Sequence, residues 1–189
     1  SPEVSILFLA ADPTDASRLR TGTESREIGE KLKLSKYRDQ FKLVQHMSVR
    51  PEDISQALLD EQPQIVHFSG HGAASGELAF EDHSGQAFPV SPDALAALFE
   101  QFANQVKFVV LNACYSEMQA KAIARHIDYV IGMTKAISDK AAIAFSVGFY
   151  QALGAGRNFE EAYKLGCVQT RLQGIPEHLT PVLIKKMEQ

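Results

Sequence analysis

Apolar runs alternate along the chain with stretches in which apolar residues recur at helical spacing. Residues 4–11 are apolar at nearly every position, as in a strand that is buried on both faces of a parallel sheet. Similar runs predict strands at residues 41–49, 64–69, 106–111 and 129–133. Helical spacing predicts helices over residues 24–37, from Pro51, from Pro92, over 117–127, after Asp139 and after the Asn158/Glu161 capping pair. This alternation predicts a doubly wound α/β sandwich with a mostly parallel sheet.

Two further segments depart from the alternation. Residues 77–80 and 86–90 flank a turn at His83-Ser84-Gly85, which predicts a β-hairpin inserted after His71. Such an insertion would form one wall of a cleft. Residues 180–185 predict a final strand or extended segment.

A histidine and a cysteine follow two of the predicted strands. His71 lies in the string His-Phe-Ser-Gly-His-Gly (67–72), and Cys114 lies in Leu-Asn-Ala-Cys-Tyr-Ser (111–116). Ligands of doubly wound sheets bind beyond the carboxyl ends of the strands, where both residues are expected. The two side chains are therefore predicted to meet.

This pair has the chemistry of a nucleophile and its acid/base partner. A cysteine nucleophile reacts as the thiolate, which a cationic neighbour or a helix N-terminus favours. His71 and the helix predicted after Ser116 would supply these. Glycines beside His71 let the backbone approach a bound peptide, and the N–H groups of Gly72 and Cys114 are candidate oxyanion donors.

The two strings resemble the His-Gly and Asn-Ala-Cys blocks of the CHAT domain, a caspase-like (clan CD) bacterial cysteine peptidase. Residues 6–13, 26–32 and 131–150 also match the family's pattern, so the resemblance covers nearly the whole chain. It implies a caspase-like α/β/α sandwich, a His71 and Cys114 dyad, and the same oxyanion donors. It also implies an effector domain of bacterial signalling or defence that a separate sensor activates.

Asp139 is a candidate for substrate specificity. The segment 132–139 resembles the stretch of separase-like peptidases that ends in an acid binding the basic residue before the cut. Carried over, Asp139 would lie in the S1 pocket and favour Arg or Lys. The alternative is that Asp139 only opens the following helix.

Each reactive side chain also has a structural interpretation. Cys114 could be an inert packing residue and His71 a turn residue, but their combination favours catalysis. His67 lies within an apolar run and is expected to be a hydrogen-bonded core histidine. Cys167 falls on a helical face and is expected to be buried or half-buried. His83 is expected at the hairpin tip.

Composition and charge limit the partners, the compartment and the cofactors that the chain is expected to have. The net charge is −4, with Lys and Arg scattered, which argues against nucleic acid. No apolar run reaches the roughly 18 residues of a membrane span. Two cysteines suggest no disulfide framework, so a reducing, cytoplasmic compartment is expected. No spacing suggests a metal site, and no cofactor is expected.

The sequence therefore predicts that residues 1–189 form one peptidase domain, cut from a longer protein. It would hydrolyse peptide bonds of a protein or peptide through a thioester, with a sensor or regulatory domain outside this chain. Two alternatives remain: an inactive caspase-like interaction scaffold, and a flavodoxin-like ligand-binding module. The residues 11–15 lack the glycine-rich turn that a phosphate-binding module would place there.

Overall fold

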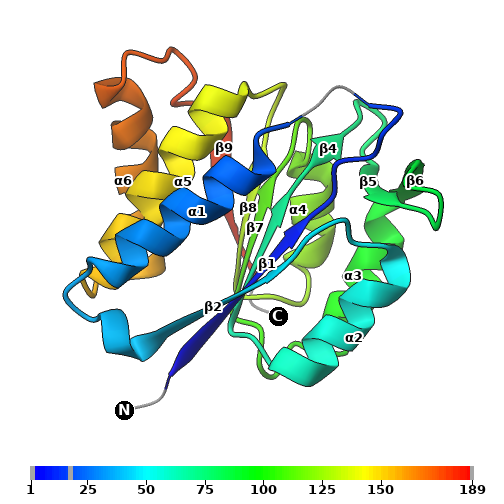
Figure 1. Cartoon of the computed structure of the whole chain (residues 1–189), viewed down its shortest axis with the longest axis horizontal. Coiled ribbons are helices and arrows are strands. Elements are labelled where there is room, and N and C mark those ends of the chain that lie inside the picture. The colour runs from blue at the N-terminus through cyan, green and yellow to red at the C-terminus, as the bar shows by residue number, and fades with distance from the viewer. Residues whose placement is uncertain (1–2, 17–18, 188–189) are drawn as a thin grey trace.

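The computed structural model describes residues 3–16 and 19–187. Within these residues, six strands form a central sheet in the order β2-β1-β3-β7-β8-β9 (Figure 1). Its strands are β1 (Val4–Ala10), β2 (Phe41–His46), β3 (Ile65–Ser69), β7 (Phe108–Asn112), β8 (Tyr129–Met133) and β9 (Pro181–Lys185). Only β9 runs antiparallel to its neighbour, so the predicted mostly parallel sheet is confirmed.

Helices cover both faces of this sheet. One face carries α1 (Thr21–Lys33), α5 (Asp139–Gly154) and α6 (Phe159–Leu172), and the other carries α2 (Pro51–Glu61), α3 (Pro92–Glu100) and α4 (Glu117–Ile123). Side chains alternate across β1 accordingly: Ile6 and Phe8 pack under α1 and α5, while Leu7 and Leu9 pack under α2 and α3. The apolar runs thus form a sheet with two cores.

A second, smaller sheet stands beside the carboxyl ends of the central strands. It contains β4 (His71–Gly72), β5 (Leu78–Glu81) and β6 (Ala87–Val90). The predicted hairpin is confirmed, and β4 adds a strand that was not predicted. The buried side chain of Gln119 donates hydrogen bonds to the carbonyls of Gly76 (2.7 Å) and Val90 (3.1 Å), which fastens this sheet to α4.

The predicted boundaries of two helices were wrong. The helix expected over 24–37 ends at Lys33, followed by a 3-10 turn, η1 (Arg38–Gln40). Beyond the helix, Tyr37 donates its N–H to the carbonyl of Gly154 at the end of α5 (3.0 Å). The helix expected over 117–127 ends at Ile123. No helix in the described residues is long and apolar enough to cross a membrane.

Candidate active site

The carboxyl ends of β3 and β7 bring His71 and Cys114 to one place. The strands are paired in register up to Ser69 and Asn112, so the residues that follow leave the sheet side by side. His71, Cys114 and Asp139 all line a cavity of about 40 Å³ at this edge. The structure therefore brings together the three side chains singled out from the sequence.

Glycine at position 72 allows this approach. A Cβ atom built on Gly72 would collide with the carbonyl oxygen of Cys114. A Cβ on Gly70 would come within 2.6 Å of the Phe68 ring and 2.9 Å of the Ala11 carbonyl oxygen. The backbones that carry the histidine and the cysteine thus touch, and no larger residue fits between them.

The sulfur of Cys114 contacts the loop between β8 and α5, residues 134–138. The backbone N–H of Ile137 donates to Sγ at 3.3 Å, and the thiol faces the Ile137 carbonyl oxygen at 3.6 Å. Tyr115, which follows the cysteine, has a left-handed φ of 57° and donates its N–H to the Lys135 carbonyl (3.2 Å). The sharp turn after Cys114 is therefore tied to the same loop.

This contact was not among the expectations for the sulfur. The sequence suggested that the helix after Ser116 would face the thiol, and α4 begins at Glu117, shortly after Cys114. The backbone of Ile137 is a further partner of the sulfur. A main-chain contact depends on tertiary structure and gives no signal in side-chain chemistry. The one available clue was that residues 134–138 follow the carboxyl end of a strand.

His71 has an acidic neighbour that was not predicted. Its Nε2 lies 3.4 Å from Oδ1 of Asp12, and each side chain is 22% exposed. Asp12 follows β1, the third strand whose carboxyl end reaches the site. The Asp12-Pro13 pair was interpreted only as a turn, yet a carboxylate directly after a buried strand was a usable signal.

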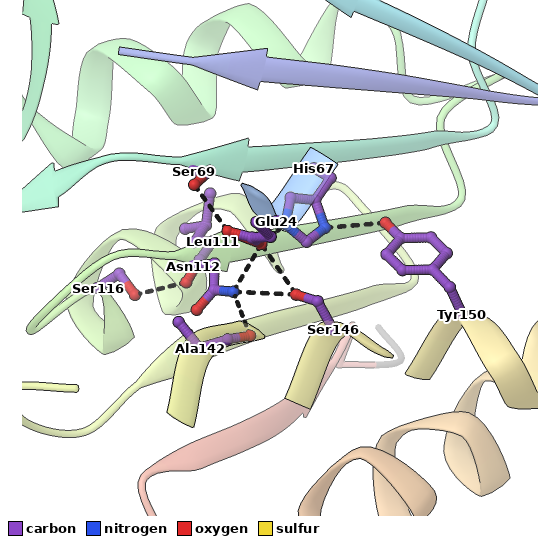
Figure 2. Close-up of polar contacts among 9 residues, drawn as sticks. All are labelled: Glu24, His67, Ser69, Leu111, Asn112, Ser116, Ala142, Ser146 and Tyr150. Atoms are coloured by element: carbon purple, nitrogen blue, oxygen red, sulfur yellow. Dashed lines mark hydrogen bonds and ion pairs between the residues drawn. The ribbon is translucent and has the colours of Figure 1, made fainter. Parts of the chain in front are cut away.

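A second carboxylate and a second histidine form a buried network beneath the site. Figure 2 shows Glu24 of α1 at its centre. Its carboxylate is bonded to His67 Nε2 (2.6 Å), and it accepts hydrogen bonds from Ser69 Oγ (2.7 Å), Asn112 Nδ2 (2.9 Å) and Ser146 Oγ (2.9 Å). The network therefore joins α1, β3, β7 and α5 immediately below the cavity.

Both ring nitrogens of His67 have partners. While Nε2 faces Glu24, Nδ1 lies 2.9 Å from the hydroxyl of Tyr150. His67 is 0% exposed, so the expected core histidine is confirmed. Burial, with repulsion from the Glu24 carboxylate, raises the pKa of Tyr150 well above its ordinary value, so this hydroxyl keeps its proton.

The charge of Glu24 is stabilised by its neighbours. Burial opposes ionisation, but attraction to His67 and hydrogen bonds from His67, Ser69 and Asn112 outweigh it. The pKa of this carboxyl is therefore below its ordinary value of 4.5. A signal for Glu24 existed in the sequence, since it shares a helical face with Ile28 and Leu32, where a charge needs a buried partner.

Asp139 is the first residue of α5, but it does not cap the helix. The cap is Ser138, whose Oγ accepts a hydrogen bond from the Ala141 N–H (3.2 Å). Asp139 lies in the first turn and borders the cavity. Asp139 therefore lies next to both the N-terminus of α5 and the cavity.

The remaining candidates lie outside the cavity. Cys167 is half-buried on α6, and burial raises the pKa of its thiol, which disfavours a second nucleophile. His83 is 81% exposed at the hairpin tip, beside Glu52 (3.3 Å). Among the described residues, no group of three or more His, Cys, Asp or Glu side chains could hold a metal ion.

Comparisons with known proteins agree with this arrangement. The family model of the CHAT domain matches residues 4–173. A Roc-COR-CHAT protease from an unknown prokaryotic organism is 28% identical over 95% of this chain, which spans 18% of that protein. A probable protease from Gillisia limnaea is 26% identical over 95% of the chain, which spans 35% of that protein. The chain thus spans only a minor part of these relatives.

Solved structures show the same fold. The Arg-specific cysteine proteinase gingipain R has a TM-score of 0.67 and 13% identity, covering 96% of this chain and 46% of that chain. Caspase-1 from Spodoptera frugiperda has a TM-score of 0.63 and 15% identity, covering 97% and 86%. The predicted caspase-like α/β fold is confirmed.

Proposed function

Because this chain belongs to the CHAT domain family, we propose that it is a caspase-like cysteine endopeptidase with Cys114 as nucleophile and His71 as acid/base. The observation that carries the proposal is that these two side chains, from separate strand ends, line one cavity. Relatives named as proteases support the same reaction class.

The reaction begins with the sulfur. The Cys114 thiolate attacks the scissile carbonyl carbon, and the oxygen of the tetrahedral intermediate takes up the negative charge. The N–H groups of Gly72 and Cys114 are the proposed donors to that oxygen. The close contact between Gly72 and the Cys114 carbonyl supports this role, because it brings the two backbone segments side by side.

The histidine moves the proton. His71 takes it from the thiol and delivers it to the leaving amine as the carbon–nitrogen bond breaks, leaving a thioester. Water, activated by His71, then attacks the thioester and releases the acid product and the thiol. Asp12 faces Nε2, so it would hold the ring with Nδ1 available as the exchanging nitrogen and would stabilise the imidazolium.

Asp139 is the proposed acid of the S1 pocket. Its carboxylate borders the cavity that contains Cys114, and capping of α5 is already supplied by Ser138. The buried Oδ1 of Asn112, which also borders the cavity, accepts no hydrogen bond from the described residues. Two acceptors at one cavity suit the donor-rich side chain of Arg or Lys.

The biological setting follows the family. We propose a cytoplasmic effector domain for bacterial signalling or defence, which cleaves a protein substrate after a sensor or regulatory domain outside this chain activates it. The relatives named Roc-COR-CHAT protease are several times longer than this chain, which leaves room for such a domain.

A peptide-library cleavage screen tests the proposal. Wild type should cleave a subset of peptides, and Cys114→Ala should cleave none, because no other group in the cavity can form the thioester. Cys167→Ala is the matched control and should retain full activity. Peptide cleavage by the Cys114→Ala protein would contradict the proposal, as would failure of wild type to react with any thiol-directed peptide probe.

A further inference from the structure

The cavity between His71 and Cys114 is too small for a substrate side chain. Its volume is about 40 Å³, room for only a few waters, whereas ligand-binding pockets usually have about 300–1,000 Å³. An arginine or lysine side chain, with several carbons and a charged group, does not fit. Some element that borders the cavity has to move before a peptide can bind as the proposed function requires.

The loop of residues 134–138 is that element. Ile137 lines the cavity, and its backbone engages the sulfur of Cys114 through both N–H and C=O. The backbone carbonyl of Lys135 accepts a hydrogen bond from the N–H of Tyr115. The loop thus covers the nucleophile. Its residues 134–136 are exposed to solvent, so nothing packs on its outer side.

A carboxylate from a distant part of the chain fixes this loop. Glu177, in the connection between α6 and β9, accepts two hydrogen bonds from Ser138, the residue after Ile137. Its Oε1 accepts the Ser138 N–H at 2.8 Å, and its Oε2 accepts the Ser138 hydroxyl at 2.6 Å. The other end of the loop is tied to the same connection, because the Thr134 N–H donates to the Thr180 carbonyl (2.9 Å).

We propose that Glu177 is a latch that holds the 134–138 loop closed over Cys114, and that substrate entry requires this latch to open. The inference rests on the proposed function for the identity of the nucleophile. The Glu177 carboxylate lies at the N-terminus of α5, where the helix dipole favours a negative charge. The contacts are charge-assisted, which stabilises the closed loop. They are also exposed to solvent, which keeps the free energy of opening small.

Alkylation of Cys114 by iodoacetamide measures opening without any substrate. The rate at each cysteine of the full chain is read by peptide mass spectrometry. Glu177→Ala should speed alkylation of Cys114 about fivefold, the gain in open population expected from losing partly exposed charged hydrogen bonds. Glu177→Gln should lie between, because an amide oxygen can still accept one bond. Glu160→Gln, a carboxylate of α6 paired with Lys185 (2.8 Å), is the matched control and should match wild type.

Cys167 reports on the alternative of general loosening. It is half-buried on α6, so latch release should leave its alkylation rate unchanged. Rates at Cys114 that are equal or slower in both Glu177 variants would overturn the proposal, and so would a matching rise at Cys167. If Glu177→Ala does not fold, the Gln variant gives the same comparison.

Peptide cleavage separates this proposal from the proposed function. If the chain is an active peptidase, Glu177→Ala should lower KM for an arginine-containing peptide while kcat stays the same, because less energy is used to open the loop. A chain without peptidase activity whose Cys114 is still unmasked by Glu177→Ala would refute the function and keep the latch.

Discussion

His67 lies in β3 and His71 lies just beyond the end of that strand. Each histidine faces a carboxylate, yet the two pairs have different surroundings. The side chains of His67 and Glu24 are 1% and 3% exposed, whereas those of His71 and Asp12 are each 22% exposed. His67 and Glu24 share hydrogen bonds with residues of β3, β7 and α5, while His71 faces a cavity beside a thiol. A histidine facing a carboxylate therefore holds the fold together in one place and is available for chemistry in the other.

The strongest test of this contrast exchanges the two histidines for alanine. His71→Ala should lower kcat/KM for peptide cleavage at least ~100-fold, the usual scale of general acid/base catalysis, with little change in the free energy of unfolding. His67→Ala should instead destabilise the protein, because it removes a buried hydrogen-bond partner of the Glu24 carboxylate and leaves a cavity. Denaturant unfolding beside a cleavage assay distinguishes them. Equal effects of both variants on stability would remove the contrast.

Glu24→Gln breaks the buried pair while keeping the shape of the side chain. The free energy of unfolding should fall by about 3–5 kcal/mol, the cost of removing one partner from a buried charged hydrogen-bond network. Glu30→Gln, an exposed position on the same helix, is the control and should change stability little. A loss as small as that of the control would mean that the pair is not charged.

The dependence of the free energy of unfolding on pH, measured under acidic conditions, gives a second test of the same pair. Since the pKa of Glu24 is lowered on folding, its stabilising contribution is complete above the ordinary value of 4.5 and disappears as pH falls through the lower, folded pKa. The stability difference between wild type and Glu24→Gln should therefore be largest above that pH and shrink below it. A difference that stays constant throughout this range would contradict the assignment of the charge.

The smallest expected effect concerns a third carboxylate, Asp139, which has no hydrogen-bond or ion-pair partner among the described residues, unlike Glu24. Asp139→Asn should lower cleavage after Arg, relative to an uncharged residue, by about tenfold, as one charged hydrogen bond is lost. Thermal stability should barely change, because Ser138 caps the helix. Asp93→Asn is the matched control, since Asp93 also lies in the first turn of a serine-capped helix. An Asp139→Asn enzyme with lower melting temperature and unchanged preference would assign the residue to the helix alone.

Local patterns along the sequence predicted most of the framework. The apolar runs predicted the central strands because strands of a parallel sheet are buried on both faces, and the Asn158/Glu161 pair marked the start of α6. The positions of His71 and Cys114 followed from the rule that strand ends meet at one edge.

The missed features depend on contacts between distant segments. The Glu24 network joins residues from four elements (Figure 2). The contact between Ile137 and the sulfur of Cys114 uses only main-chain atoms of Ile137. The turn after α1 is tied to the last residue of α5 through the N–H of Tyr37. Periodicity marks Glu24 as a charge on a buried helical face, but the partners in these contacts cannot be deduced from it, since each requires the tertiary arrangement of several elements.

The last strand bears on where this domain can be cut for laboratory work. The family match ends at residue 173, but all five residues of β8 pair with β9, which begins only at Pro181. A fragment trimmed at the family boundary would turn β8 into an open edge with unpaired backbone groups, which invites aggregation in an expression host. It would also lack Glu177 and Thr180, so it would lose the contacts over its nucleophile. A usable fragment has to extend through Lys185.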